Sequence, residues 1–319
     1  MATVNQHYVP QFYLRRWQGI NCGPGKIYSL NLDRKNPKCP YGRISPIAVK
    51  CVCSQKNLYD NFDKNTGEYV SCNYIEQEFG LLEQKWNNLI ATLENRCNRK
   101  NLNKSIFCSQ REWQELTRMA SLFCMRHPKH MKENLSEATV YHSDNIHPHL
   151  RQRLQECLFV GIDSDELETY VSSPPEIDEQ YNWVFELLKQ QILKKWNGKP
   201  LFQFNAENIQ REYSPVFYWD PEGLFFASSY SMAGQSDELA GHIFFPLSPY
   251  LVLVFTKSKK GRRPGRRNRL VEVRDTVRQN INMCLLSYAA ENDGCVFSRS
   301  ESELKKVLDV YGMQNMNRK

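Results

Sequence analysis

The sequence of 319 residues contains no long uninterrupted hydrophobic run. Its longest apolar neighbourhood, His242 to Phe255, is broken by Pro246, Ser248 and Pro249 and is shorter than the roughly 20 residues that a membrane-spanning helix needs. The first residues contain no apolar segment of the kind found in secretory signals. We therefore expect a cytoplasmic protein that has no membrane partner.

Several catalytic and metal-binding motifs are also missing. There is no Gly-x-Ser-x-Gly elbow, which disfavours a serine hydrolase. The 11 cysteines are scattered without the pattern of a small secreted domain, so we interpret them as reduced thiols. Cys51 and Cys53 are separated by one residue, a poorer spacing for zinc than two, and neither Cys39 nor Cys72 has a paired neighbour. Ordinary packing is therefore favoured over a structural zinc site.

Acidic residues are absent from one strongly basic segment, residues 257–269. Without its eight cations the formal net charge of +7 would fall to −1, so the basicity of the chain resides in this segment. The cations are Lys257, Lys259, Lys260, Arg262, Arg263, Arg266, Arg267 and Arg269.

Glycine and proline interrupt the basic segment, which indicates a flexible loop rather than a helix face. Concentrated charge of one sign favours nucleic acid as the partner, and the lack of stacking aromatics favours phosphate contact without base readout. The alternative is a solvated loop with no partner. The residues expected to contact nucleic acid are Lys259, Lys260, Arg262, Arg263, Arg266 and Arg267.

The segment Asn5–Trp17 is unusually rich in special residues for one so close to a chain end. It carries four aromatic residues, two arginines, His7 and Pro10. Pro10 suits the first position of a short helix that would end at Trp17. The residue before a proline is pushed out of the α region, so His7 and Tyr8 should be held in an extended conformation. His7 could then act as a general base, or it could hydrogen-bond the backbone and fix the segment to a sheet.

The string His7-Tyr8-Val9-Pro10-Gln11-Phe12-Tyr13-Leu14-Arg15 resembles the opening signature of a widespread bacterial domain-of-unknown-function family, the HYVP-motif family. Members often continue to Phe-x-Thr-Ser-Asp-x-Pro and then Pro-Leu-Ser-Pro. This chain has Phe226 to Met232 and then Pro246 to Pro249, so the resemblance extends from residue 7 to at least residue 249. Tyr230 replaces the expected acid and Met232 the expected proline. The resemblance implies a layout and brings no established activity.

Hydrophobic periodicity predicts an α+β protein of one domain, residues 1–319, in three sub-regions. Residues 1–72 should be β-rich, with strands near 26–32, 44–52, 57–59 and 68–70. Residues 73–197 should form the central helical layer, with helices from Asn73, from Ser109, and over 146–159 and 177–196. Residues 198–311 should be β-rich, with strands at 201–204, 215–219, 224–228, 243–246, 251–256 and 295–297.

The last sub-region should also contain helices at 270–288 and 300–310. The N-terminal and C-terminal strands should share one mixed or antiparallel sheet, against which the helical layer packs. Ser109 with Glu112, and Ser300 with Glu303, match capping boxes, as do Asn73 with Glu76.

The candidate site residues are polar groups on the helices and at one strand end. Glu76 and Glu83 are seven apart on one helix face and could hold one divalent metal, magnesium or manganese. The alternative is that Glu76 is a capping residue and Glu83 is solvated. Arg118 and Arg126 could bind phosphate, although Arg126 near a helix C-terminus also has a structural explanation. Ser228 and Ser229 follow a strand, where ligand contacts are common.

Two functions of different class are consistent with these residues. The first is binding or metal-dependent cleavage of nucleic acid, with His7 as base, Glu76 and Glu83 on the metal and Arg118 or Arg126 on phosphate. The second is a non-catalytic interaction module in host–phage conflict, in which the HYVP motif is structural. A role in phage defence is compatible with either function. The sequence leaves the enzyme question, the metal, any protein partner and the oligomeric state open.

Overall fold

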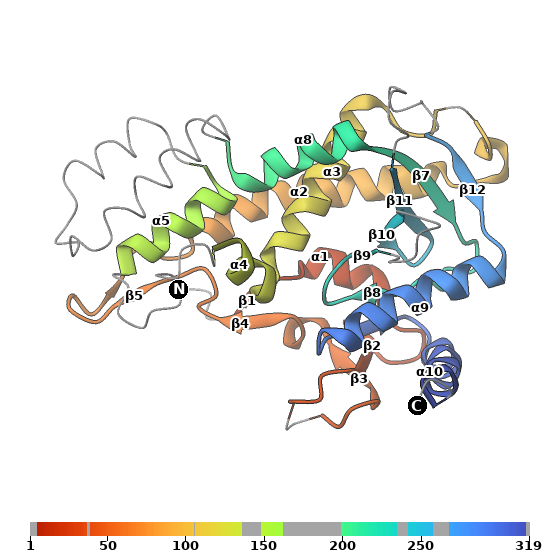
Figure 1. The fold of residues 1–319 in the computed structure, drawn as a ribbon, viewed down its shortest axis with the longest axis horizontal. Helices are drawn as coiled ribbons and strands as arrows, with labels where there is room; N and C mark the ends of the chain where they lie inside the picture. Colours follow the sequence, from red (N-terminus) through yellow and green to blue (C-terminus); the bar gives the residue numbers. More distant parts are fainter. Residues whose placement is uncertain are drawn as a thin grey trace.

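The computed structural model describes residues 5–36, 39–104, 106–135, 148–161, 199–234, 242–257 and 268–316. It confirms the predicted α+β class (Figure 1). The helices are α1 Gln11–Leu14, α2 Tyr74–Arg96, α3 Gln110–Arg126, α4 Pro128–Leu135, α5 Pro148–Phe159, α8 Leu201–Glu212, α9 Asp275–Glu291 and α10 Glu301–Met316. Within the described ranges, no helix is both long and apolar enough to cross a membrane.

The strands form two principal sheets and two short pairs. They are β1 Asn5–His7, β2 Lys26–Asn31, β3 Ile44–Ala48, β4 Ser54–Lys56, β5 Phe62–Asp63, β6 Glu68–Tyr69, β7 Tyr213–Trp219, β8 Ala227–Ser228, β9 Ala233–Gly234, β10 His242–Ser248, β11 Leu251–Lys257, β12 Leu270–Glu272 and β13 Cys295–Ser298.

One sheet joins strands from both ends of the chain, as predicted. Its order is β3-β2-β13-β8, and all of its neighbours are antiparallel. Phe297 of β13 pairs with Ser29 on one side and Ala227 on the other. The N-terminal strands are therefore completed by residues more than 250 positions away.

The other principal sheet is mixed and has the order β12-β7-β11-β10-β9, with β12 parallel to β7. Both faces of β11 are buried. Leu251, Leu253 and Phe255 belong to the core cluster beneath α2, α3 and α8, whereas Val252 and Val254 belong to the cluster beneath α9. Alternating side chains of one strand thus serve two cores, and Figure 1 shows α9 on the side opposite α2 and α3.

Helix α3 is the centre of the helical layer. Ser109 Oγ accepts the Glu112 N–H and the Glu112 carboxylate accepts the Ser109 N–H, so the predicted capping box is present. The predicted apolar face of α2 is likewise formed, since Phe79, Trp86 and Ile90 are buried. The layer covers the five-stranded sheet mainly through α3 and α8.

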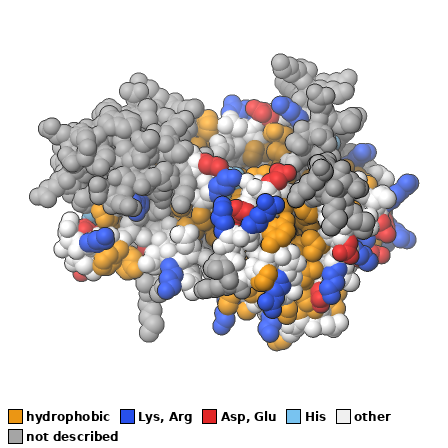
Figure 2. All heavy atoms as spheres, turned by 60° about the horizontal axis from the view of Figure 1, so that its bottom comes forward, with side chains coloured by type: hydrophobic (Ala, Val, Ile, Leu, Met, Phe, Trp, Pro, Cys, Tyr) orange, Lys and Arg blue, Asp and Glu red, His pale blue; other side chains and the backbone are white. Residues whose placement is uncertain are grey.

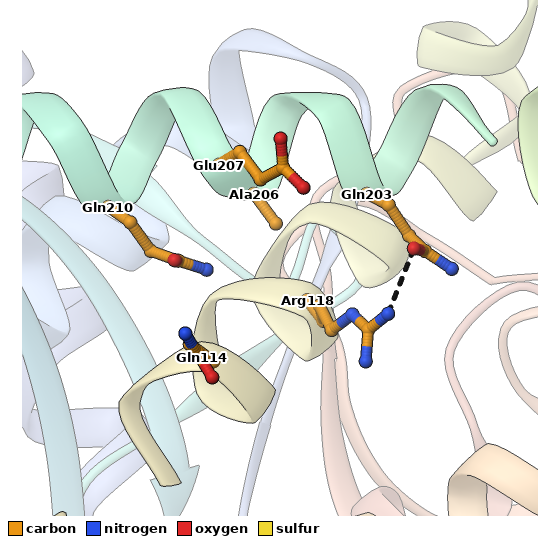
Figure 3. Close-up of a pocket in the computed structure, with 6 residues that line it drawn as sticks. All are labelled: Gln114, Arg118, Gln203, Ala206, Glu207 and Gln210. Atoms are coloured by element: carbon orange, nitrogen blue, oxygen red, sulfur yellow. Dashed lines mark hydrogen bonds between the residues drawn. The ribbon is translucent and has the colours of Figure 1, made fainter. Parts of the chain in front are cut away.

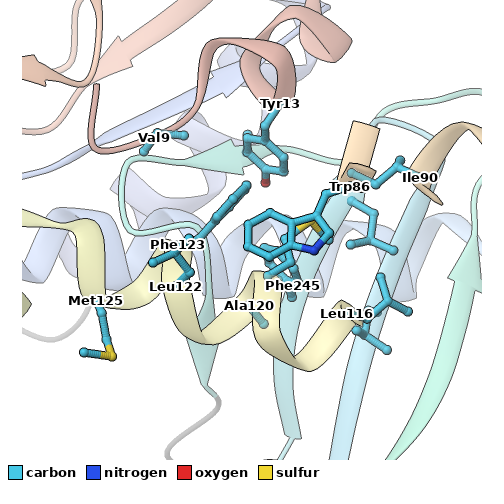
Figure 4. Packing of buried hydrophobic residues seen from close by; sticks show 14 of the residues in the cluster. Val9, Tyr13, Trp86, Ile90, Leu116, Ala120, Leu122, Phe123, Met125 and Phe245 are labelled. Atoms are coloured by element: carbon cyan, nitrogen blue, oxygen red, sulfur yellow. The ribbon is translucent and has the colours of Figure 1, made fainter. Parts of the chain in front are cut away.

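The HYVP segment enters the core through the aromatic side chains of its helix. Tyr13 packs edge-on against Phe123 of α3 and lies parallel to Phe245 of β10, as Figure 4 shows. Its hydroxyl donates to the Pro246 carbonyl at 2.8 Å. Trp17, in the 3-10 turn Arg15–Trp17, donates from its ring N–H to the Phe225 carbonyl at 2.9 Å. Buried aromatic groups with satisfied polar atoms fasten this segment to the fold.

Four predicted elements are wrong. The strand predicted near 57–59 is a turn, because β4 pairs with β1 only over Ser54–Lys56. Residues 201–204 are the start of helix α8, because Leu201, Phe202 and Ala206 recur at helical spacing and a four-residue window could not separate the two periods. The helix predicted from Leu270 begins at Asp275, because residues 270–272 instead complete the sheet beside β7. Asn73 has a left-handed backbone with φ 58° and makes no side-chain cap, so its predicted capping box is absent.

Other boundaries shift. The strand expected over 44–52 ends at Ala48 and continues as a 3-10 turn, and only Ala227–Ser228 of the segment 224–228 is a strand. The last helix extends to Met316 rather than to residue 310. The predicted segments 162–175 and 177–196 lie outside the described residues.

Candidate functional site

The backbone of His7 lies between two charged helix faces. His7 pairs with Ser54 in the β1–β4 ladder, and Tyr8 N–H donates to the Cys53 carbonyl at 2.9 Å. The His7 carbonyl accepts a hydrogen bond from the Arg126 guanidinium of α3. The backbone of His7 also lowers the pKa of Glu76 of α2, so that carboxyl group lies within its electrostatic reach. The strand predicted to be extended is thus fixed from both sides.

Arg126 is the centre of this cluster and is only 1% exposed. It donates to Glu83 Oε1 at 2.6 Å and to the Tyr59 hydroxyl at 3.1 Å, and its guanidinium lies 4.2 Å from the centre of the Phe79 ring. Burial by itself lowers the pKa of Arg126, but Tyr59, Glu83 and Glu76 offset burial and hold that pKa above its usual value. Arg126 therefore stays charged, and the carboxylates compensate its charge.

The structure thus brings together four of the predicted site residues, His7, Glu76, Glu83 and Arg126. Burial raises the pKa of Glu76, while Arg126 opposes that shift and Glu83 adds to it. The Glu76 and Glu83 carboxylates both interact with the guanidinium of Arg126. Across the described residues, no group of three or more His, Cys, Asp or Glu side chains is arranged to hold a metal ion.

The ring of His7 is 9% exposed and its environment favours the neutral form. Burial lowers the pKa of His7, and Arg126 and Arg15 act in the same direction, whereas the Lys50 carbonyl and Glu83 oppose them. Its Nδ1 lies 3.3 Å from Gln11 Nε2. Its Nε2 is buried and has no hydrogen-bond partner among the described residues. Because an amide nitrogen can only donate, Nδ1 is the acceptor of this contact, and the neutral ring carries its hydrogen on the buried Nε2.

The predicted strand end at Ser228 reaches the HYVP segment through stacked rings. Tyr8 lies edge-on to His127 with ring centres 5.1 Å apart, and His127 stacks on Tyr230 at 3.9 Å. Ser228 and Ser229 are buried, and their hydroxyls accept the backbone N–H groups of Tyr230 and Cys295. The two serine hydroxyls are therefore occupied by hydrogen bonds to the backbone of this turn and its neighbouring strand.

Tyr230 replaces the acid that the family resemblance leads one to expect, and the surrounding chain fits the larger side chain. Its hydroxyl donates to the Asn292 carbonyl at 2.6 Å. A Cβ at Gly294 would lie 2.8 Å from the Tyr230 ring and 2.7 Å from Ser229 Oγ, so only glycine leaves room there. Tyr230 is thus built into this turn as a packing residue.

Arg118 lies apart from the His7 cluster, in a polar pocket of about 240 Å³ between α3 and α8. Figure 3 shows the residues that line it, namely Gln114, Arg118, Gln203, Ala206, Glu207 and Gln210. Arg118 donates to Gln203 Oε1 at 2.8 Å. The sequence pattern missed Gln203, Glu207 and Gln210 because residues 201–204 were predicted as a strand, which hid their common helix face.

Of the basic segment, only its two ends are described. Lys259, Lys260, Arg262, Arg263, Arg266 and Arg267 lie outside the described residues. At one end, Lys257 pairs with Tyr213 at the edge where α8 passes into β7. At the other end, Asn268 Oδ1 accepts the Cys108 N–H at 2.9 Å, immediately before Ser109, the N-cap of α3. Both ends are therefore held at the helix pair that forms the pocket.

The charges of the described residues are dispersed over the face that Figure 2 shows, where Lys and Arg side chains lie singly or in small groups among acidic and apolar ones.

All eleven cysteines are described and are free thiols, with Cys51 and Cys72 exposed and Cys53 buried. His149 lies 3.9 Å from Asp63, while His142 and His147 lie outside the described residues.

The chain belongs to the family described as Protein of unknown function (DUF4238), whose model matches residues 5–302. The match confirms the predicted membership of a domain family of unknown function. No curated protein and no solved structure shows a significant match. The family's description names no activity, so function is inferred from the geometry of the site.

Replacing Arg126 tests the buried charge cluster. Arg126→Met should lower the free energy of unfolding by about 3–5 kcal/mol, because it leaves the Glu83 carboxylate and the His7 carbonyl without their donor. Arg126→Lys keeps the charge but loses the planar, forked set of N–H donors. Its free energy of unfolding should lie between those of Arg126→Met and wild type. Exposed Arg15→Met is the control and should change stability by less than about 0.5 kcal/mol. Urea denaturation measures the free energy of unfolding of all three variants. Equal losses in Arg126→Met and Arg15→Met would show that the buried Arg126 does not stabilise the fold.

His127 should make stability fall at mildly acidic pH. Burial, with smaller contributions from His130 and Lys129, lowers the pKa of His127 from 6.5 to about 3. Between those values the unfolded chain binds a proton that the folded chain does not. Stability should therefore decrease as pH falls below 6.5, by up to about 1.4 kcal/mol per pH unit from this residue.

His127→Phe should flatten this slope between pH 7 and pH 5, measured by urea denaturation at each pH. A core variant with comparable destabilisation, Phe159→Leu, should retain the wild-type slope. Identical slopes in wild type and His127→Phe would show that His127 does not carry the effect.

Proposed function

We propose that this protein binds nucleic acid through phosphate contacts made by the basic segment 257–269. The observation that carries the proposal is the attachment of this segment. Lys257 is tied to the C-terminal end of α8, and Asn268 to the N-terminal end of α3. The segment, whose sequence contains eight cations and no acid, therefore has both of its described ends at one end of the helix pair. Clustered cations of this kind bind phosphates by releasing counterions.

In this proposal the HYVP segment is structural. Val9, Tyr13 and Trp17 are fully buried, and the His7 carbonyl accepts a hydrogen bond from the buried Arg126. Arg126 places a positive charge beside Glu76 and Glu83, and this charge would repel a magnesium or manganese ion that approached the same carboxylates. The donor set is thus already compensated, and we derive no metal-dependent step through it. We therefore propose a binding module rather than an enzyme as the leading function. We also propose that this module acts in phage defence.

Removing four cations tests phosphate binding directly. Serine at Arg262, Arg263, Arg266 and Arg267 should weaken binding to all DNA and RNA sequences alike and flatten the slope of log affinity against log salt by up to about four units, since each phosphate contact contributes about one. The unfolding transition should be unchanged. Fluorescence anisotropy over a salt series measures the slope.

The matched control removes four scattered cations, Lys56, Lys64, Lys100 and Lys305, and so makes the same change in net charge. Its salt slope should stay near that of wild type. If wild type shows no salt-dependent binding at low ionic strength, or if both quadruple variants behave alike, the segment is not the nucleic-acid contact.

A second candidate function, phosphodiester cleavage at His7, is favoured by one observation. The His7 ring has a lowered pKa and a buried Nε2 without a described partner. A neutral imidazole can remove a proton from an attacking water through Nδ1, the nitrogen that the Gln11 amide contacts, and Arg126, Glu83 and Arg15 are the charged groups that act on its pKa. In this candidate His7 is the general base and Arg126 steadies the phosphate.

His7→Gln should abolish any cleavage of labelled single-stranded or double-stranded DNA and RNA, measured with magnesium, with manganese and with a chelator. Glutamine keeps the backbone contacts of residue 7, so the melting temperature should stay within a few degrees. His149→Gln, which removes a histidine elsewhere, is the control and should leave the rate unchanged. Full activity in His7→Gln, or none in wild type under all three conditions, would exclude His7 as a base.

A further inference from the structure

We propose that the pocket between α3 and α8 binds a guanine base of single-stranded nucleic acid. This inference rests on the proposed nucleic-acid binding and gives it a base preference that the basic segment alone cannot supply. The pocket offers a guanidinium, three amides and one carboxylate around a space of about 240 Å³. That volume accommodates a single small planar group, and every lining residue except Ala206 carries hydrogen-bonding atoms.

Arg118 is held in a fixed orientation at one side of the pocket. Its Nη2 donates to Gln203 Oε1 at 2.8 Å and its Nη1 donates to Glu115 Oε1 at 3.1 Å. Glu115 is itself fixed, since it accepts from the Trp86 ring N–H at 3.2 Å and from Lys85 at 2.9 Å. A guanidinium has five N–H donors, so two bonds to the protein leave others for a ligand. Two acceptors side by side are the natural complement, and guanine presents them as O6 and N7.

Glu207 supplies the acceptor that distinguishes a base from a phosphate. It lies on α8 between Gln203 and Gln210, and Figure 3 shows its carboxylate directed toward the Gln203 side of the pocket, above Arg118. One of its oxygens pairs with Lys199 at 2.6 Å. A carboxylate in the pocket repels an anion, but it accepts hydrogen bonds from the N1–H and N2–H groups of guanine. Adenine has no such pair of donors.

The remaining walls suit a flat ring. The side-chain amides of Gln114 and Gln210 come from facing helices, and Ala206, the small residue between them, leaves room at the base of the pocket. Gln210 is further held by a hydrogen bond to Thr117 Oγ1 at 2.7 Å. Single-stranded nucleic acid exposes its base edges, so the edges of one base are free to hydrogen-bond with side chains of this kind. A base here would place its phosphates toward the two anchored ends of the basic segment.

The test uses single atoms of the base. Twelve-residue single strands of otherwise identical sequence would carry guanine, adenine, inosine or 7-deazaguanine at one central position, in both RNA and DNA. Guanine should bind at least about tenfold more tightly than adenine, since a good bidentate contact discriminates by roughly that factor or more. Inosine lacks the N2 amine and 7-deazaguanine lacks N7, so each should bind less tightly than guanine. Fluorescence anisotropy at fixed salt measures the four affinities.

Two variants test which side chain contacts the N2 amine of guanine and which contacts N7. Glu207→Gln should remove the difference between guanine and inosine, and Arg118→Gln should remove the difference between guanine and 7-deazaguanine. In both variants the salt slope should remain that of wild type, because the basic segment is untouched. Glu212→Gln, at the exposed end of the same helix, is the matched control and should keep both differences.

The outcomes separate this inference from the proposal beneath it. Equal affinity for all four strands, with a steep salt dependence, would overturn the guanine pocket and leave phosphate binding by the segment intact. Absence of binding to every strand at low salt would overturn both. Base preferences that persist unchanged in Glu207→Gln and Arg118→Gln would place the readout elsewhere and overturn the assignment to this pocket.

Discussion

The buried charge of Arg126 is the constraint on which much of the structure depends. A guanidinium that is 1% exposed must be compensated, and its compensation comes from three separate parts of the chain. Glu83 belongs to α2, Tyr59 to the loop after β4, and the His7 carbonyl to β1. These parts can satisfy Arg126 only in one mutual arrangement. One charge thereby orients the helical layer relative to the N-terminal segment.

The aromatic side chains of the HYVP helix extend that arrangement into the sheets. Tyr13 reaches the Pro246 carbonyl of β10, and Trp17 reaches the Phe225 carbonyl ahead of β8. The first bond joins the N-terminal segment to the five-stranded sheet, and the second joins it to the segment that leads into β8. Motif residues that look suited to chemistry in the sequence are therefore largely occupied with the fold. His7 is the exception, because one ring nitrogen remains without a described partner.

Two regions with different chemistry emerge from this arrangement. The His7 cluster is buried and compensated internally, whereas the pocket at Arg118 is polar, partly open and framed by the anchored ends of the basic segment. Arg118 and Arg126 lie on the same helix and look equivalent in the sequence. Arg126 is enclosed by α2 and the N-terminal segment, and Arg118, which has a side chain 36% exposed, faces α8 and solvent. Their surroundings, rather than their residue type, give them different roles.

The sequence by itself determined what depends on neighbours in the chain. The period of α2, the capping box at Ser109 and the extended strand before Pro10 follow from local sterics and hydrogen bonding. The local pattern also selected His7, Glu76, Glu83 and Arg126 as candidate site residues and placed Glu76 and Glu83 on one helix face. Only the tertiary structure decided that these four meet, that β12 pairs with β7 instead of extending α9, and that residues 201–204 belong to a helix. Those outcomes depend on contacts between residues far apart in sequence, whose packing and charge compensation no local window contains.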